Sequence, residues 1–162
     1  DSPGYAWRVQ VRLAAIEHAC ARHGLHPPAV ERISLEAADA AAAVGRWTQG
    51  PEPVTAACAF DDDYAFALLS GLASHSLSAP GDLAVIGAED LPLAGLAVPP
   101  LTTVSVHARM LGALFAQLAI APLLGADADA DAGRQAGGTR PASEGTAAQP
   151  VPPVTLVRRA SA

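Results

Sequence analysis

Two short apolar runs, separated by a helical pattern, limit this chain most strongly to one class of fold. Residues 54–60 and 83–87 are almost continuously apolar, which is typical of strands covered on both faces. Between them, residues 62–77 carry apolar side chains at helical spacing, Leu68 and Leu72 among them. A strand, a helix and a second strand in this order form a βαβ unit, in which the two strands are parallel. The sequence therefore predicts an α/β fold, a doubly wound parallel sheet with helices on both faces.

The rest of the chain continues this alternation. Helices are predicted where apolar side chains recur every three or four residues, and strands where short apolar runs stand between turn residues. The predicted elements outside the central unit are a helix over residues 6–23 that ends before Gly24, a strand over 30–35 weakened by Glu31 and Arg32, a helix over 38–49, an extended segment over 101–104, a helix over 107–121 with Gly125 ending the element, and a last strand over 154–157.

The charge of the chain argues against direct binding to nucleic acid. The formal net charge is −6, and all ten basic residues are arginines, scattered apart from the pair Arg158 and Arg159. A DNA-binding surface needs clustered basic side chains that displace the counterions of the phosphates. We therefore expect any contact with DNA to be made by a segment outside this sequence.

The sequence also bears on the cellular compartment. The polar, turn-like start does not resemble a signal peptide, and Gln117 interrupts the best candidate for a membrane-spanning run. Cys20 and Cys58 both stand in apolar patterns, which indicates buried thiols. These features predict a cytoplasmic protein that does not interact with membranes.

Acidic side chains follow both buried strands. Asp61–Asp63 come directly after the first strand, and Glu89 and Asp90 follow the second. Ligands of open parallel sheets bind just beyond the carboxyl ends of the strands. One cleft lined by several carboxylates is therefore predicted at this edge, with Arg12 of the first helix as its cation.

Simpler explanations remain open for these residues. An aspartate at the start of a helix can serve only as its N-cap, and Arg12 can be an ordinary surface residue. The triplet Asp61–Asp63 lacks the ligand spacing of a calcium loop, and Cys20, His23 and His26 lack the further ligands that a zinc site needs. No catalytic motif is recognisable, although paired carboxylates could also serve a glycosidase. We predict no enzyme activity, no metal and no cofactor.

Five short motifs occur in order along the chain. They are Arg12-Leu13-Ala14-Ala15-Ile16, Phe60-Asp61-Asp62-Asp63-Tyr64-Ala65-Phe66-Ala67, Val85-Ile86-Gly87-Ala88-Glu89-Asp90, Pro99-Pro100-Leu101-Thr102-Thr103-Val104 with Gly112 after it, and Leu156-Val157-Arg158-Arg159-Ala160-Ser161. They resemble, in that order, the motifs Arg-x-x-Gly-Phe, Asn-Asp-x-x-Ala-x-Gly, Val-Val-Gly-Phe-Asp-Asp, Pro-Pro-Leu-Thr-Thr-Val and Leu-Val-x-Arg-x-Ser of the lactose repressor family of transcriptional regulators. The Leu-Thr-Thr-Val stretch is the most specific, and the resemblance covers nearly the whole chain apart from residues 126–149.

The resemblance implies a bilobed fold like that of periplasmic sugar-binding proteins, with the effector held between the lobes and two chains forming a homodimer. The DNA-binding head and most of the N-terminal lobe are then expected upstream of this sequence. The implied divisions are the C-terminal lobe over residues 1–100, a crossover strand and one N-terminal-lobe helix over 101–125, a disordered Ala/Asp/Gly-rich insertion over 126–152, and the final strand of the C-terminal lobe over 153–162.

The resemblance also implies an effector site formed by Arg8, Arg12, Leu35, Asp61 and Glu89. Asp61 replaces the family's asparagine, so an amide that donates and accepts becomes a carboxylate that only accepts. Glu89 replaces an aspartate and is one methylene longer. We therefore expect a polyol or an amine-bearing ligand in preference to an anionic one.

The sequence thus predicts the ligand-sensing domain of a bacterial transcriptional regulator. It would bind a small, sugar-like effector and control DNA binding by a helix-turn-helix outside this sequence. The alternative is a sugar-binding protein of a transport system with the same fold. A helix-turn-helix upstream would favour the regulator, and a signal peptide would favour the transport protein.

Overall fold

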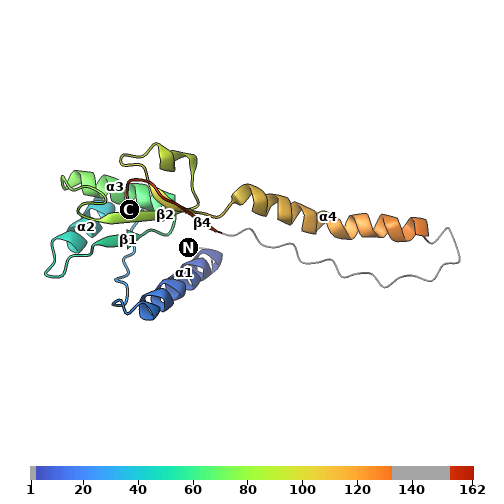
Figure 1. Cartoon of the computed structure of the whole chain (residues 1–162), viewed down its shortest axis with the longest axis horizontal. Coiled ribbons are helices and arrows are strands. Elements are labelled where there is room, and N and C mark those ends of the chain that lie inside the picture. Colours follow the sequence, from blue (N-terminus) through green and yellow to red (C-terminus); the bar gives the residue numbers. More distant parts are fainter. Residues whose placement is uncertain (1–2, 133–153) are drawn as a thin grey trace. The chain divides into compact units, whose positions relative to one another are not determined.

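The computed structural model describes residues 3–132 and 154–162. Helices and strands alternate along most of the chain, as the sequence predicts (Figure 1). The helices are α1 (Pro3–Arg22), α2 (Ala37–Thr48), α3 (Asp62–Ser74), α4 (Ala108–Ala132) and the short 3-10 helix η1 (Pro92–Gly95), and the strands are β1 (Ala56–Cys58), β2 (Ala84–Ala88), β3 (Thr102–Ser105) and β4 (Thr155–Val157).

The described strands form one sheet in the order β1-β2-β3-β4. β1 is parallel to β2, with Ala57 opposite Val85, and β2 is parallel to β3, with Gly87 opposite Thr103. In Figure 1, α1 and α3 lie on opposite sides of these strands. The predicted α/β fold with a parallel sheet covered on both faces is confirmed.

The core lies between α2, α3 and β2. Val44 of α2, Leu72 of α3 and Val85 of β2 are fully buried, together with Leu83 and Leu101 beside the strands. These side chains are aliphatic, as the low aromatic content of the sequence requires. Since the interior is close-packed, this core fixes the orientation of α3 against β2 and thereby the start of α3 at the carboxyl end of β1.

The chain divides into two compact units. One comprises the residues up to Val104 together with Leu156–Ala162, and the other runs from Ser105 to Thr155. The assignment of the predicted segments to two lobes stays a prediction. Among the described residues, no helix is both long and apolar enough to cross a membrane.

Four predictions about local structure are wrong. The sequence predicts that the thiols of Cys20 and Cys58 are both buried, but Cys58 is exposed and Cys20 is half-buried. Residues 30–35 form no strand; Val30 is exposed, and Glu31 pairs instead with Arg46 of α2, so the segment presents no continuous apolar face to a sheet. The last predicted helix does not end at Gly125 but continues to Ala132, because one glycine costs a helix only about 1 kcal/mol and the flanking sequence is rich in alanine. Residues 126–132 are therefore helical rather than disordered, and residues 133–152 of the predicted insertion lie outside the described part.

Gly71 allows α3 to lie against the backbone of α2. A Cβ atom at this position would come within 2.8 Å of the carbonyl oxygen of Ala40. We expect Gly71→Ala to lower the free energy of unfolding by about 1–3 kcal/mol, because the helices must separate to admit the methyl group. Urea unfolding followed by circular dichroism measures this change.

Gly95→Ala is the matched control. A Cβ atom there meets no heavy atom within 4 Å, so this variant should unfold at nearly the wild-type urea concentration. Equal midpoints for the two variants would contradict the close contact between α2 and α3.

Candidate ligand site at the carboxyl end of the sheet

The first aspartate after β1 is the N-cap of α3. Asp61 has extended backbone angles, and its Oδ1 atom accepts a hydrogen bond from the backbone N–H of Tyr64 at 3.1 Å. This bond satisfies one of the N–H groups that the first turn of a helix leaves unpaired. The sequence leaves open which of the three aspartates caps the helix, and the structure assigns this role to Asp61. The second carboxylate oxygen of Asp61 has no hydrogen bond within the described residues.

The second aspartate is a buried structural residue that the sequence analysis missed. Asp62 is fully buried; its Oδ1 atom accepts from the hydroxyl of Thr103 at 2.5 Å, and its Oδ2 atom accepts from the N–H of Leu91 at 2.7 Å. A Cβ atom at residue 87 would lie 2.2 Å from the same Oδ1 atom. Gly87 is the one sequence feature that points to this buried contact, since a glycine within a buried strand indicates that another group approaches closely.

The backbone after β2 turns sharply at Glu89 and Asp90, which have φ angles of 105° and 58°. The N–H of Glu89 donates to the carbonyl of Val104 at 2.8 Å. Asp90 forms an ion pair with Arg159 at 2.8 Å, so its carboxylate has a structural role. The half-buried side chain of Glu89 makes no hydrogen bond or ion pair with the described residues and can accept from a ligand.

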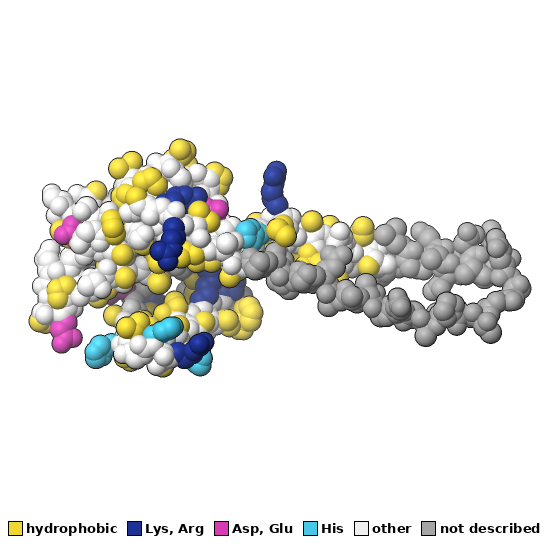
Figure 2. Space-filling view, in the orientation of Figure 1, with side chains coloured by type: hydrophobic (Ala, Val, Ile, Leu, Met, Phe, Trp, Pro, Cys, Tyr) yellow, Lys and Arg dark blue, Asp and Glu magenta, His cyan; other side chains and the backbone are white. Residues whose placement is uncertain are grey.

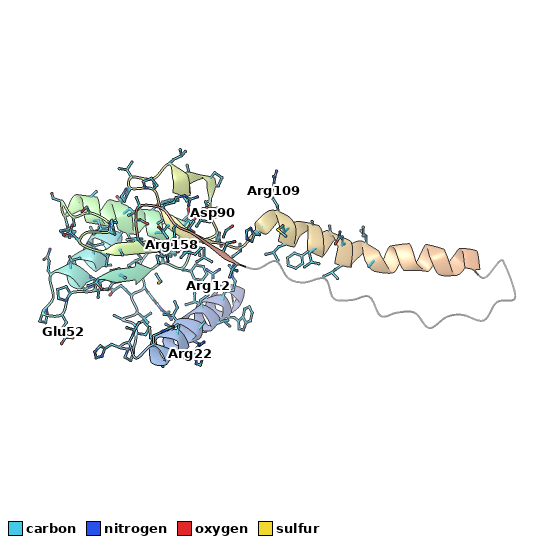
Figure 3. All side chains as sticks on the ribbon, viewed as in Figure 1. Arg12, Arg22, Glu52, Asp90, Arg109 and Arg158 are labelled. Atoms are coloured by element: carbon cyan, nitrogen blue, oxygen red, sulfur yellow. The ribbon has the colours of Figure 1, made fainter. Side chains whose placement is uncertain are left out.

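Arg12 lies over the aromatic ring of Phe60, the second residue after the end of β1. Its guanidinium carbon is 4.4 Å from the ring centroid, and that of Arg8 is 5.8 Å away. Arg12 also donates to the carbonyl oxygen of Phe60. Such cation–π contacts stabilise a guanidinium beside the ring, and Arg12 is half-buried rather than an ordinary surface residue. In Figure 3, Arg12 and Asp90 lie toward the same end of the strands.

The structure thus brings together some of the predicted site residues. Arg8 and Arg12 both lie against Phe60, which directly precedes Asp61. Glu89 stands beyond the end of the neighbouring strand β2. Leu35 is 55% exposed in the segment before α2, and its place in the site stays a prediction. The role of Phe60 escaped the sequence analysis because a phenylalanine after a strand is usually only a core residue.

These groups suit hydrogen bonding to a neutral, hydroxyl-rich molecule. The carboxylates of Asp61 and Glu89 accept, whereas the guanidinium of Arg12 donates. Within residues 3–132 and 154–162, no three histidine, cysteine, aspartate or glutamate side chains are grouped so that they could hold a metal ion. A molecule that carries hydroxyl groups could satisfy both the donors and the acceptors.

Comparisons with known proteins identify the family of this chain. Residues 4–162 match the family model of the periplasmic binding protein-like domain. The lactose operon repressor of Rhizobium radiobacter is 31% identical over 77 residues, which are 48% of this chain and 66% of the repressor. The resemblance to the effector-binding domains of the lactose repressor family is thereby confirmed.

Solved structures share the fold. A LacI family transcriptional regulator from Lactobacillus casei with bound sucrose has a TM-score of 0.68 and 24% identity, covering 94% of this chain and 51% of its own. The lac repressor dimer bound to operator and the anti-inducer ONPF has a TM-score of 0.67 and 21% identity, covering 95% of this chain and 41% of its own. The chain spans about half the length of these structures, or less.

Removal of the buried carboxylate of Asp62 tests its structural role. We expect Asp62→Ala to lower the free energy of unfolding by at least about 2 kcal/mol, because two donors then lose their acceptor in a dry environment. Asp63→Ala is the control, since Asp63 is exposed in the same first turn and its interaction with the helix dipole contributes less than about 1 kcal/mol. Chemical unfolding of both variants decides, and a larger loss for Asp63→Ala would refute the assignment.

Proposed function

The chain belongs to the family of periplasmic binding protein-like domains, and from that premise we propose that it senses a neutral sugar or another polyol for a transcriptional regulator. The observation that carries the proposal is that Arg12 is held over Phe60 at the end of the sheet where carboxylates follow β1 and β2. The lactose operon repressor among its relatives supports a regulator over a transport protein.

The balance of charge at the site favours a ligand without negative charge. Glu89 and the second oxygen of Asp61 can only accept hydrogen bonds when ionised, and Arg12 can only donate. The hydroxyls of a polyol satisfy both kinds of group, since each hydroxyl donates one hydrogen bond and accepts others. A phosphorylated sugar would add further negative charge beside these two carboxylates, which is unfavourable in a partly buried site.

Regulation would follow from a shift between conformations. A ligand can move such an equilibrium only by as much as its affinities for the two states differ. The proposed sensor would bind its effector better in one arrangement of the whole protein and would thereby change the binding of operator DNA. Because this chain carries a net charge of −6, the DNA contact is assigned to a separate helix-turn-helix, and the regulator would work in the cytoplasm.

An exposed apolar surface supports the predicted homodimer. Leu96 and Val98, after η1, are 76% and 91% exposed, and Figure 2 shows hydrophobic side chains on the surface in this region. They border a hollow of about 450 Å³ whose other walls come from α3 and η1. Contiguous apolar surface of this kind is typical of protein–protein contacts, and a relative of the same fold is a dimer.

Isothermal titration calorimetry with sucrose and lactose tests ligand binding. We expect Glu89→Gln and Arg12→Ala to weaken binding of the sugar that binds by roughly 10- to 100-fold, the effect of losing a hydrogen bond to a charged group. Glu52→Gln and Arg158→Ala are the matched controls, because both residues are exposed and should leave the affinity unchanged. Tight binding of glucose 6-phosphate that persists in Glu89→Ala would overturn the assignment.

Sedimentation equilibrium tests the proposed dimer. We expect the wild-type chain to dimerise and Val98→Asp to shift it to monomer, because burial of the introduced carboxylate is unfavourable. Leu25→Asp is the control, since Leu25 is also an exposed aliphatic residue, 64% accessible, but lies between α1 and α2. A monomeric wild-type chain, or equal dissociation of both variants, would contradict this surface.

A further inference from the structure

The turn that carries Glu89 has an unusual backbone. Glu89 and Asp90 have φ angles of 105° and 58°, a region that residues with a Cβ atom rarely adopt. Two such residues in succession cost conformational free energy and persist only where the surrounding structure holds them. The groups that hold this turn therefore also determine where the carboxylate of Glu89 lies.

The backbone of the turn is bound more firmly at its two ends than in its middle. The N–H of Glu89 donates to the carbonyl of Val104 at 2.8 Å, and the N–H of Leu91 donates to the buried carboxylate of α3 at 2.7 Å. The N–H of Asp90 lies 3.4 Å from the hydroxyl oxygen of Thr103, which is long for a hydrogen bond. The backbone alone therefore holds the turn least well at Asp90.

The side chain of Asp90 supplies further support at this point. Its Oδ1 atom accepts a hydrogen bond from Nη2 of Arg159 at 2.8 Å. The side chains of Asp90 and Arg159 are only 27% and 23% exposed, so water and salt screen this ion pair less than a pair on the open surface. The pair therefore holds the turn at the residue where its backbone hydrogen bond is weakest.

Arg159 is itself fixed in place by the edge of β3. Its Nη1 atom donates to the carbonyl of Leu101 at 2.8 Å, and its backbone N–H donates to the hydroxyl of Thr102 at 2.9 Å. The planar guanidinium is thus ordered by a second partner besides Asp90. The preceding residue, Arg158, is exposed and forms no ion pair with the part of the chain that the structure describes. Of the two neighbouring arginines, only the second supports the turn.

We propose that Arg159 is a positioning residue for ligand binding, which holds the strained turn through Asp90 and thereby keeps the carboxylate of Glu89 in place for the ligand. Arg159 acts without contacting the ligand. An acceptor that is ordered before binding loses less conformational entropy when the ligand arrives, which raises the affinity. This inference rests on the proposed function, in which Glu89 accepts a hydrogen bond from a sugar hydroxyl.

Calorimetry with the sugar that binds, sucrose or lactose, tests the effect on affinity. We expect Arg159→Gln and Asp90→Asn each to weaken binding about 3- to 30-fold, because binding must then also order the turn. Asparagine keeps the shape of aspartate and tolerates a positive φ, so Asp90→Asn removes only the charge of the pair. Arg158→Gln is the matched control and should change the affinity less than about twofold, since Arg158 is exposed.

A Glu89→Ala background shows whether Arg159 acts through Glu89. Once the carboxylate is gone, adding Arg159→Gln should change the affinity less than about twofold, so that the two losses are not additive. Full additivity would show that Arg159 serves a group other than Glu89 and would overturn the proposal. The double variant Asp90→Asn with Arg159→Gln should bind no more weakly than the weaker of the two single variants, because both act through one ion pair.

Amide hydrogen exchange, measured by NMR without any sugar, tests the support of the turn by itself. We expect the N–H groups of Glu89 and Leu91 to exchange about tenfold faster in Arg159→Gln than in the wild-type chain, because the turn opens more often. The N–H of Ala84, which donates to the carbonyl of Thr55 at 2.9 Å, is the internal reference. Its exchange rate should change less than about twofold.

Three further results would contradict the proposal. Equal losses of affinity in Arg159→Gln and Arg158→Gln would refute the role of the ion pair. Equal acceleration of exchange at Glu89 and Ala84 in Arg159→Gln would show that Arg159 stabilises only the fold as a whole. Unchanged exchange at Glu89 would show that the turn is held without the pair. Because exchange is measured without sugar, it decides on the support of the turn even if neither sugar binds, an outcome that would contradict the proposed function.

Discussion

The buried carboxylate of Asp62 joins three segments of the first unit that are far apart in the sequence. A carboxylate with no access to solvent is stable only when hydrogen-bonded, and its donors are the hydroxyl of Thr103 on β3 and the N–H of Leu91 after β2. The same Oδ1 atom occupies the space that a side chain at Gly87 would need. Asp62, Gly87 and Thr103 therefore depend on one another, and together they fix the start of α3 against the ends of β2 and β3.

The last residues of the chain complete this frame. The hydroxyl of Ser161 donates to the carbonyl of Val85 at 2.6 Å and accepts from the N–H of Thr102 at 2.8 Å, so one fully buried side chain connects β2 and β3. Arg159 donates to the carbonyl of Leu101 and pairs with Asp90. The turn that carries Glu89 is thus held at both ends, which keeps the candidate ligand residue on a rigid support.

The α/β fold could be predicted because it depends on local patterns, the buried runs at residues 54–60 and 83–87 and the helix between them. The roles of Asp61–Asp63 could not, because any of three consecutive aspartates at a helix start can cap it. Their roles are set by the position of α3, which leaves Asp61 outside the helix as its cap, buries Asp62 and exposes Asp63. The partners of Asp62 lie 29 and 41 residues away, and no pattern in a single sequence identifies them.

Phe60 explains how an arginine and carboxylates can share the end of the sheet without neutralising one another. If Arg12 formed an ion pair with Asp61, both groups would lose capacity to bind a ligand. Instead the guanidinium lies over a neutral ring and donates to the carbonyl of the same residue, and among the described residues it forms no ion pair. An aromatic ring stabilises the cation without accepting its hydrogen bonds in the guanidinium plane. The remaining donors of Arg12 and the acceptors of Glu89 therefore do not neutralise one another, as the proposed site for a neutral polyol requires.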